Sequence, residues 1–270
     1  MPLNFKQILE KYAALKAELQ PHQERVLKKL KKQDALLLYH GLGSGKTLSS
    51  IAASEPYKSV NVVVPASLRE NYKKELEKFH ADPAKRHITS YEGAVNKGLP
   101  KADFLILDEA HRLGTSGSQR TQSIYEHAPK HQKRLLLTGT PIKNKPHELA
   151  PLARILDPKS KELPLSESEF NKKFIGEQTI HHKGFNRIKE AIGFLEPGVK
   201  PVMQNPQAIQ KAFKDKVDYY KPEQKDYPTV AYKTVPVDMT PDQEDIYKTV
   251  INKANPLLAA KVKSNIPPSK

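Results

Sequence analysis

The segment of this chain best suited to chemistry is residues 40–47, which read HGLGSGKT directly after the apolar run ALLLY. Glycines at Gly43 and Gly45 leave the backbone free to turn its N–H groups inward, toward the oxygens of a phosphate. Lys46 could then reach the terminal phosphates of a nucleotide, and the hydroxyl of Thr47 could bind magnesium. The segment therefore predicts a phosphate-binding loop.

The flanking residues favour this interpretation over a plain glycine-rich turn. Residues 35–39 form a candidate buried strand, and residues 47–53 could begin a helix whose N-terminus faces the phosphates. One residue departs from the expected spacing, because His40 stands where the pattern usually has a glycine.

A second reactive segment, DEAH at residues 108–111, follows the apolar run at 103–107. That run has no polar alternation, which is typical of a central strand in a parallel sheet. Ligands of such sheets lie at the carboxyl ends of the strands. There Asp108 could hold magnesium and Glu109 could polarise an attacking water.

A third apolar run, residues 134–137, leads into Thr138, Gly139, Thr140 and Pro141. Small hydroxyl side chains at a strand end could link a nucleotide site to another surface. The alternative is an ordinary exit from a strand, because Thr-Gly-Thr-Pro is also good turn chemistry.

The elements that must position these residues alternate along the chain between strands and helices. Helices are expected over 4–19 and 20–30, and strands over 35–39, 60–64, 86–90, 103–107 and 134–138. This alternation predicts an α/β fold with a parallel sheet covered by helices on both faces. We expect a domain over 1–158 and a small, mainly helical appendage over 159–220, with helices at 169–175 and 207–213. An extended linker and tail are expected over 221–270.

Composition limits the possible partners and compartments. The formal net charge is +15, which suits a polyanion such as nucleic acid, although a lysine-rich surface without a partner is the alternative. There is no cysteine, and no apolar run approaches the length of a membrane span. We therefore expect an intracellular protein, of the cytoplasm, the nucleus or a virus-infected cell, with no membrane partner.

Taken together, HGLGSGKT, DEAH and TGTP resemble motifs I, II and III of the superfamily-two helicases and translocases. LQPHQERVLKKL at 19–30 resembles the adenine-reading Q motif, VVVPASLRENYKKEL at 62–76 resembles motif Ia, and ITSYEGA at 88–94 resembles motif Ib. HRLGTSGSQR at 111–120 and PVDMTPDQEDIY at 236–247 resemble the Swi/Snf-type branch. Gly114 departs from the basic residue often found after the acidic box in that branch.

The resemblance implies a RecA-like P-loop NTPase domain that uses ATP and Mg²⁺. It also implies a role for each matching residue: adenine contact by Gln23; phosphate binding by Gly43, Ser44, Gly45, Lys46 and Thr47; magnesium binding by Thr47 and Asp108; catalysis by Lys46, Asp108 and Glu109; nucleic-acid contact by Pro65, Ala66, Ser67, Ser90 and Tyr91; and coupling between the two sites by His111, Thr138, Gly139 and Thr140.

The resemblance further implies the N-terminal motor domain of a DNA-dependent ATPase that moves on duplex DNA. Such motors hydrolyse ATP between two RecA-like domains, and the second domain supplies an arginine. No second arginine motif follows residue 150, so the isolated chain is expected to be weakly active or inactive without a second domain in cis or in trans. The alternatives are an RNA helicase, a restriction-type translocase, or a fragment that binds ATP and nucleic acid without hydrolysis.

Overall fold

The computed structural model describes residues 18–180, 198–223, 231, 233 and 235–253. The chain divides into two compact units, Met1–Glu223 and Gln224–Lys270. The helix expected over 4–19 lies outside the described residues except for its last two positions, and so do residues 254–270 of the linker and tail expected over 221–270.

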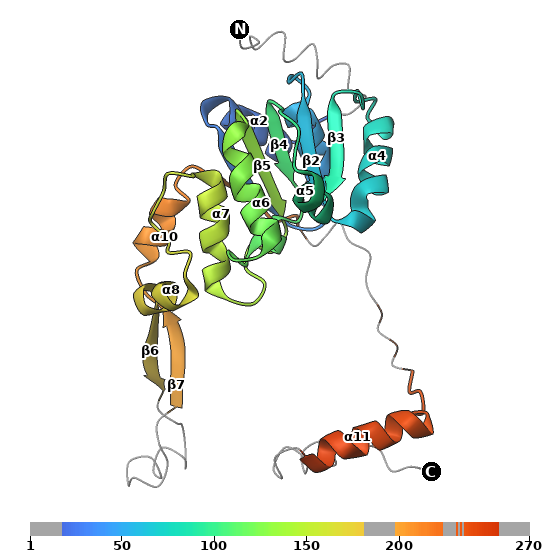
Figure 1. Ribbon diagram of the computed structural model, residues 1–270, viewed down its shortest axis with the longest axis vertical. Coiled ribbons are helices and arrows are strands. Elements are labelled where there is room, and N and C mark those ends of the chain that lie inside the picture. Colours follow the sequence, from blue (N-terminus) through green and yellow to red (C-terminus); the bar gives the residue numbers. More distant parts are fainter. Residues whose placement is uncertain (1–17, 181–197, 224–230, 232, 234, 254–270) are drawn as a thin grey trace. The chain divides into compact units, whose positions relative to one another are not determined.

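The first unit is built on a parallel sheet of six strands (Figure 1). Every strand runs in the same direction as its neighbours. Across the sheet the order is β3 (Arg86–Ser90), β2 (Val60–Val64), β4 (Phe104–Leu107), β5 (Lys133–Thr138), β1 (Ala35–His40) and β8 (Val217–Tyr220). The structure confirms all five expected strands. It adds β8, which the sequence did not predict.

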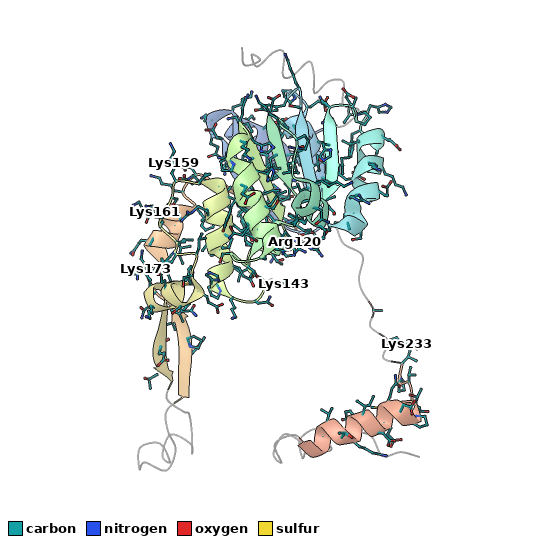
Figure 2. The ribbon with its side chains drawn as sticks, in the orientation of Figure 1. Arg120, Lys143, Lys159, Lys161, Lys173 and Lys233 are labelled. Carbon is teal, nitrogen blue, oxygen red and sulfur yellow. The ribbon has the colours of Figure 1, made fainter. Side chains whose placement is uncertain are left out.

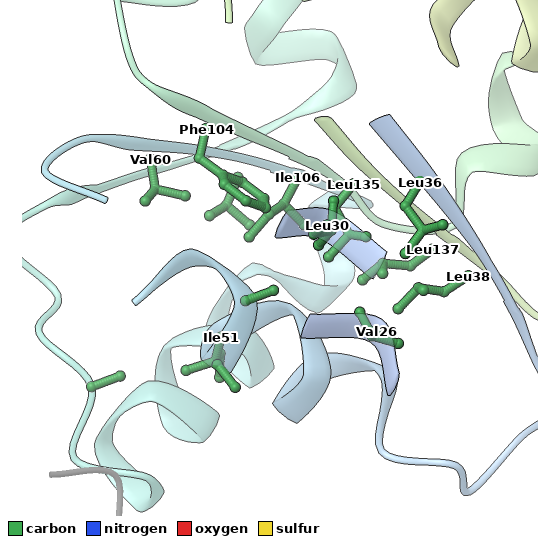
Figure 3. Close-up of a cluster of buried hydrophobic side chains, with 14 of the residues drawn as sticks. Val26, Leu30, Leu36, Leu38, Ile51, Val60, Phe104, Ile106, Leu135 and Leu137 are labelled. Atoms are coloured by element: carbon green, nitrogen blue, oxygen red, sulfur yellow. The ribbon is translucent and has the colours of Figure 1, made fainter. Parts of the chain in front are cut away.

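Helices cover both faces of the sheet, because the central strands are apolar on both sides. In β1, Leu36 and Leu38 face one core while Ala35 and Leu37 face the other. The first core lies under α2 (Pro21–Lys32), α3 (Lys46–Ser54) and α4 (Arg69–Lys78) (Figure 3). The second lies under α5 (Tyr91–Lys97), α6 (Gln119–His127) and α7 (Leu149–Leu156). The expected α/β architecture is therefore confirmed.

The carboxyl end of the sheet carries the segments of chemical interest. The phosphate loop follows β1, the short helix η1 (Ala66–Leu68) follows β2, and η2 (Ala110–Leu113) begins three residues after β4. The segment after β5 leads to η4 (Pro146–Glu148), and η3 (Ala128–Lys130) precedes β5 at its other end. Parallel strands thus bring residues far apart in sequence to one edge.

The appendage contains the expected helices and also strands. Helices α8 (Glu167–Phe174) and α10 (Pro206–Ala212) flank the antiparallel pair β6 (Ile175–Ile180) and β7 (Gly198–Met203). A third apolar cluster, which includes Phe170, Phe174 and Ala212, packs against Ala150 and Ala153 of α7. The chain then returns to the main sheet through β8, so this segment is anchored at both of its ends.

The second unit contains α11 (Pro241–Lys253), a helix within the region expected to be linker and tail. Its start has a reciprocal cap, because the Thr240 amide donates to Gln243 Oε1 (3.0 Å) and the Gln243 amide donates to Thr240 Oγ1 (3.4 Å). Within the described part of the chain, no helix combines the length and apolar character that a membrane span requires.

Candidate nucleotide-binding site

The phosphate loop has the backbone conformation that its glycines predict. Gly43 and Gly45 have φ values of 73° and 70°, in the left-handed region that favours glycine. Gly45 is the N-cap of α3, so the first amides of that helix face the loop. His40 needs no such freedom, because it is the last residue of strand β1. The departure from the usual pattern is therefore compatible with the loop.

Lys46 is held inside the loop by the chain itself. Its Nζ donates to the carbonyls of His40 (3.0 Å) and Gly41 (3.1 Å). Burial lowers the pKa of Lys46, while the carboxylates of Glu109 and Asp108 act in the opposite direction. The ammonium group thus lies between the loop and the acidic pair, where it could exchange carbonyl oxygens for phosphate oxygens.

Helix α2 closes over the loop through its first turn. His22 Nε2 donates to the Ser44 carbonyl (2.8 Å), and Gln23 Nε2 donates to the Gly45 carbonyl (3.3 Å). A Cβ on Gly45 would lie only 2.5 Å from Gln23 Nε2, so a side chain there would displace the end of Gln23, in addition to the strain of a φ of 70°. Gln23 is 3% exposed and touches the loop, and its contact with adenine stays a prediction.

The acidic pair follows β4 as expected. The Asp108 amide donates to the Val63 carbonyl (2.9 Å), which fixes the residue beside β2. Burial and the neighbouring Glu109 carboxylate raise the pKa of Asp108 to about 6. Glu109 has φ 50°, which is strained for a residue other than glycine and is common at functional sites.

The residues expected to contact nucleic acid fall into two groups. Ala66 and Ser67 are exposed at the end of β2, as contact with the backbone of a nucleic acid requires, whereas Pro65 is buried. Ser90 Oγ caps α5 by accepting from the Gly93 amide (2.9 Å). Tyr91 is 0% exposed, and its hydroxyl donates to the Asp108 carbonyl (2.7 Å). The Tyr91 side chain therefore holds the backbone of the acidic pair and does not face solvent.

The residues expected to couple two sites lie beside Glu109. His111 Nδ1 lies 3.2 Å from Glu109 Oε2 and 3.1 Å from Thr138 Oγ1. The Thr138 hydroxyl also accepts from the Thr140 amide (3.1 Å). A Cβ on Gly139 would lie 3.6 Å from the His40 carbonyl oxygen, so this segment passes close to the phosphate loop.

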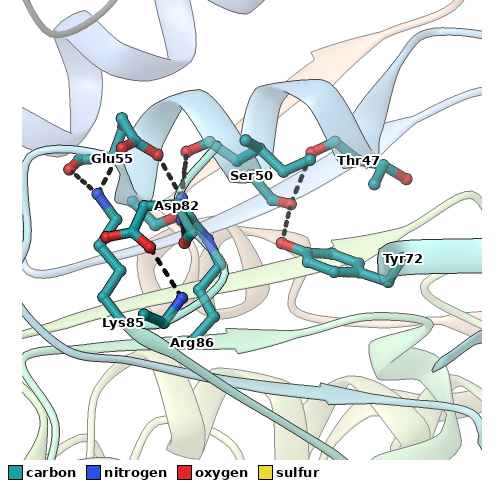
Figure 4. A network of polar contacts seen from close by, with 10 residues as sticks. Thr47, Ser50, Glu55, Tyr72, Asp82, Lys85 and Arg86 are labelled. Carbon is teal, nitrogen blue, oxygen red and sulfur yellow. Dashed lines mark hydrogen bonds and ion pairs between the residues drawn. The ribbon is translucent and has the colours of Figure 1, made fainter. Parts of the chain in front are cut away.

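The groups from the first two motifs surround one cavity of about 130 Å³. The expected residues in its lining are Lys46, Thr47, Asp108 and Glu109. The lining also includes three residues that the sequence did not single out, Leu68, Asn71 and Tyr72. Ser50 Oγ donates to the Thr47 carbonyl (2.8 Å) and lies 3.0 Å from the Tyr72 hydroxyl, which ties α3 to α4 (Figure 4). All three missed residues lie within the segment that resembles motif Ia, which was the available signal.

The donor set fits magnesium in a nucleotide complex. Within the described residues, no group of three or more His, Cys, Asp or Glu side chains could hold a metal. Magnesium in P-loop proteins needs only one or two protein oxygens, because phosphate and water complete its shell. Thr47 and Asp108 line the same cavity, and the repulsion between Asp108 and Glu109 is of the kind a divalent cation relieves.

The fold and this site define a RecA-like α/β domain with a phosphate loop. Residues 87–266 match the model of the SNF2-related domain, and the chain belongs to that family. The matched segment begins after residues 40–47, so the assignment of these residues as a phosphate loop rests on their own types and geometry and stays a prediction.

The proteins that this chain resembles in sequence include two named as helicases. A putative ATP-dependent RNA helicase of Acanthamoeba polyphaga mimivirus is 29% identical over 48% of this chain and 30% of its own length. Helicase swr1 of Schizosaccharomyces pombe is 31% identical over 45% of this chain and 12% of its own length. The chain thus spans less than a third of either relative.

A solved structure shares the fold. The Sulfolobus solfataricus SWI2/SNF2 ATPase core, determined in complex with dsDNA, matches with a TM-score of 0.59 and 23% identity. The match covers 97% of this chain and 56% of that one.

Proposed function

We propose that this chain is the ATP-binding N-terminal motor domain of a DNA-dependent ATPase that translocates on duplex DNA. One observation carries the proposal: Lys46, Thr47, Asp108 and Glu109 line a single cavity at the carboxyl end of a parallel sheet. This set combines a cation for phosphate, oxygens for magnesium and a carboxylate for water.

Each group has a defined task in this mechanism. Lys46 moves from the carbonyls of His40 and Gly41 to the β- and γ-phosphates. The hydroxyl of Thr47 and the carboxylate of Asp108 hold Mg²⁺, which neutralises charge on the phosphates when bound. The strained Glu109 orients the attacking water, and His111 holds the Glu109 carboxylate toward the Thr138 segment.

Nucleic acid is the partner that the surface and the relatives support. Arg112, Lys143 and Lys145 are exposed on the segments that follow the acidic pair and β5, close in sequence to the proposed coupling residues. Lys143 is labelled in Figure 2, together with Arg120 of α6. The Sulfolobus ATPase core was determined in complex with dsDNA, which favours duplex DNA over single strands as the partner of this chain.

We further propose that efficient hydrolysis requires a second RecA-like domain. Among the described residues that line the cavity there is no arginine, the side chain that stabilises transition-state charge in such enzymes. Since this chain covers 56% of the matched ATPase core, a partner domain in cis or in trans could supply it.

The test is ATP hydrolysis by the chain, with and without duplex DNA, against Lys46→Ala and Glu109→Gln. Both variants are measured for ATP binding as well. We expect Lys46→Ala to lose binding, and Glu109→Gln to retain binding while losing any hydrolysis. Equal ATP binding by the wild type and Lys46→Ala would contradict the proposed site.

A non-hydrolysing ATP- and nucleic-acid-binding fragment is the second candidate, favoured by the absence of arginine from the described cavity lining. Lysine-dependent binding without turnover, even with duplex DNA present, would support it. Parallel assays with single-stranded DNA and duplex RNA would distinguish a translocase from an RNA helicase, the class named for the mimivirus relative.

A further inference from the structure

Asp218 of β8 is a buried carboxylate with partners from two other elements of the first unit. It is 0% exposed, and it accepts from Arg25 Nε (2.8 Å) and Nη2 (2.7 Å) of α2. Lys29 Nζ of the same helix lies 3.0 Å away. The remaining partner is His40 Nε2, at 2.8 Å from Asp218 Oδ1. Asp218 therefore joins α2 to the residue at which the phosphate loop begins.

Backbone hydrogen bonds also connect β8 to the start of the phosphate loop. Strand β8 pairs with β1 in parallel, with Leu38 opposite Asp218 and His40 opposite Tyr220. The Gly41 amide donates to the Tyr220 carbonyl (2.9 Å). The Tyr220 ring stacks on His22 at 3.7 Å between centroids, and His22 holds the loop carbonyl of Ser44. Tyr220 thus contacts the loop at Gly41 directly and at Ser44 through His22.

The His40 ring depends on Asp218 for its orientation. His40 is 0% exposed, and its other ring nitrogen, Nδ1, has no hydrogen-bond partner among the described residues. The carbonyl of the same residue receives Lys46 Nζ at 3.0 Å. The ring that Asp218 contacts and the carbonyl that holds Lys46 therefore belong to the same residue.

We propose that Asp218 is a positioning residue for the phosphate loop and that it acts through the ring of His40. A histidine at the usual glycine position makes this possible, because glycine offers no side chain for a distant carboxylate to hold. The functional consequence rests on the proposed function, since Asp218 would set the loop in its nucleotide-binding shape without touching nucleotide. The geometric part of the proposal stands independently of ATP.

The test compares two substitutions of His40 with the removal of its acceptor, Asp218. Gln in His40→Gln can still donate to Asp218, whereas Leu in His40→Leu fills a similar volume but cannot donate. Asp218→Leu removes the acceptor, and the double variant joins it to His40→Leu. Asp215→Asn is the matched control, because Asp215 is exposed three residues earlier and its φ of 60° is tolerated by asparagine.

Two readouts are measured: hydrogen exchange of amides 41–45 in the nucleotide-free chain, and affinity for ADP. We expect His40→Leu and Asp218→Leu each to speed loop exchange and weaken ADP binding about fivefold to tenfold, within the usual net effect of one hydrogen bond. His40→Gln and Asp215→Asn should stay within about twofold of wild type, and the double variant should match the single ones.

Several results would overturn the proposal. One is loop exchange in His40→Leu at the wild-type rate. Another is His40→Gln as impaired as His40→Leu, which would reduce the histidine to packing. Additive effects in the double variant would show that Asp218 acts by another route. If Asp218→Leu does not fold, the two His40 variants still decide the question.

Failure of the proposed function gives a different signature. Wild type and Lys46→Ala would then bind ADP equally, while exchange of the loop amides would still show whether Asp218 positions them.

Discussion

The Nδ1 atom of His111 lies 3.1 Å from the hydroxyl of Thr138, and this contact joins the segment after β4 to the end of β5. The same nitrogen lies 3.2 Å from the Glu109 carboxylate. A change in Glu109 when nucleotide binds would therefore reach Thr138 through His111, and then Thr140, whose amide donates to the Thr138 hydroxyl.

Thr138→Val should weaken communication between the two ligands. Valine keeps the buried shape of Thr138 but removes the oxygen that His111 and the Thr140 amide contact. We expect affinity for a non-hydrolysable ATP analogue to stay within about twofold, while the factor by which duplex DNA alters that affinity moves toward one. Titrations of the analogue with and without DNA measure this factor. Thr138→Ser keeps the hydroxyl and serves as the control; equal coupling in all three proteins would contradict the role.

Asp108→Asn should stabilise the nucleotide-free chain at pH 8. The raised pKa of Asp108, about 6, means that the folded state disfavours the charged carboxylate more than the unfolded chain does. This group therefore costs stability above pH 6, and the cost disappears as the pH falls toward the unfolded pKa of about 4. Asparagine should raise the free energy of unfolding by about 2–3 kcal/mol at pH 8. Denaturant melts at pH 8 and pH 4.5 test this, and an equal gain at both pH values would contradict it.

Ionised Asp218 should stabilise the folded chain, which is the opposite of the effect of ionised Asp108, and this contribution should be lost in acid. Burial opposes its ionisation, but hydrogen bonds from Arg25, His40 and Lys29 outweigh burial and hold the pKa of Asp218 well below its usual range. Its stabilising contribution is therefore complete above the unfolded pKa of about 4 and is lost as the pH falls below it. His22 and Tyr220 border the same cluster.

Denaturant melts of Asp218→Leu and Asp215→Asn from pH 7 to pH 3 measure this contribution. The gap in stability between Asp218→Leu and wild type should narrow with acid, while Asp215→Asn should follow wild type throughout. A gap that stays constant with pH would contradict the assignment.

Phe170→Ala should loosen the appendage while the sheet stays folded. Phe170 is 0% exposed, packs on Phe174 at 4.8 Å between ring centroids, and faces His147 at 5.6 Å. Truncation of such a side chain costs about 3–5 kcal/mol. Hydrogen exchange should accelerate in α8 and α10 and change little in β4 and β5. Met203→Ala, at a position that is 40% exposed, is the control; uniform acceleration across the domain would show that the appendage and sheet unfold together.

Sequence alone determined the central strands and the chemistry at their ends. The runs ending at Tyr39, Leu107 and Leu137 are apolar on both faces, and only a sheet covered on both sides can bury them. Residue type and spacing alone also predict the chemistry of the loop, with its glycines and Lys46, and of the acidic pair after β4.

Only the tertiary structure decided where the polar partners of that site come from. Strand β8 reads VDYY, too short and polar to be distinguished from a linker, yet it joins the sheet beside β1. Asp218 meets His40 across 178 residues of sequence, a pairing that no local pattern encodes. Tyr91 follows the same logic, because its buried hydroxyl donates to the Asp108 carbonyl, a contact that only the fold creates. Local propensity fixes which elements form, whereas long-range pairing fixes which side chains they bring together.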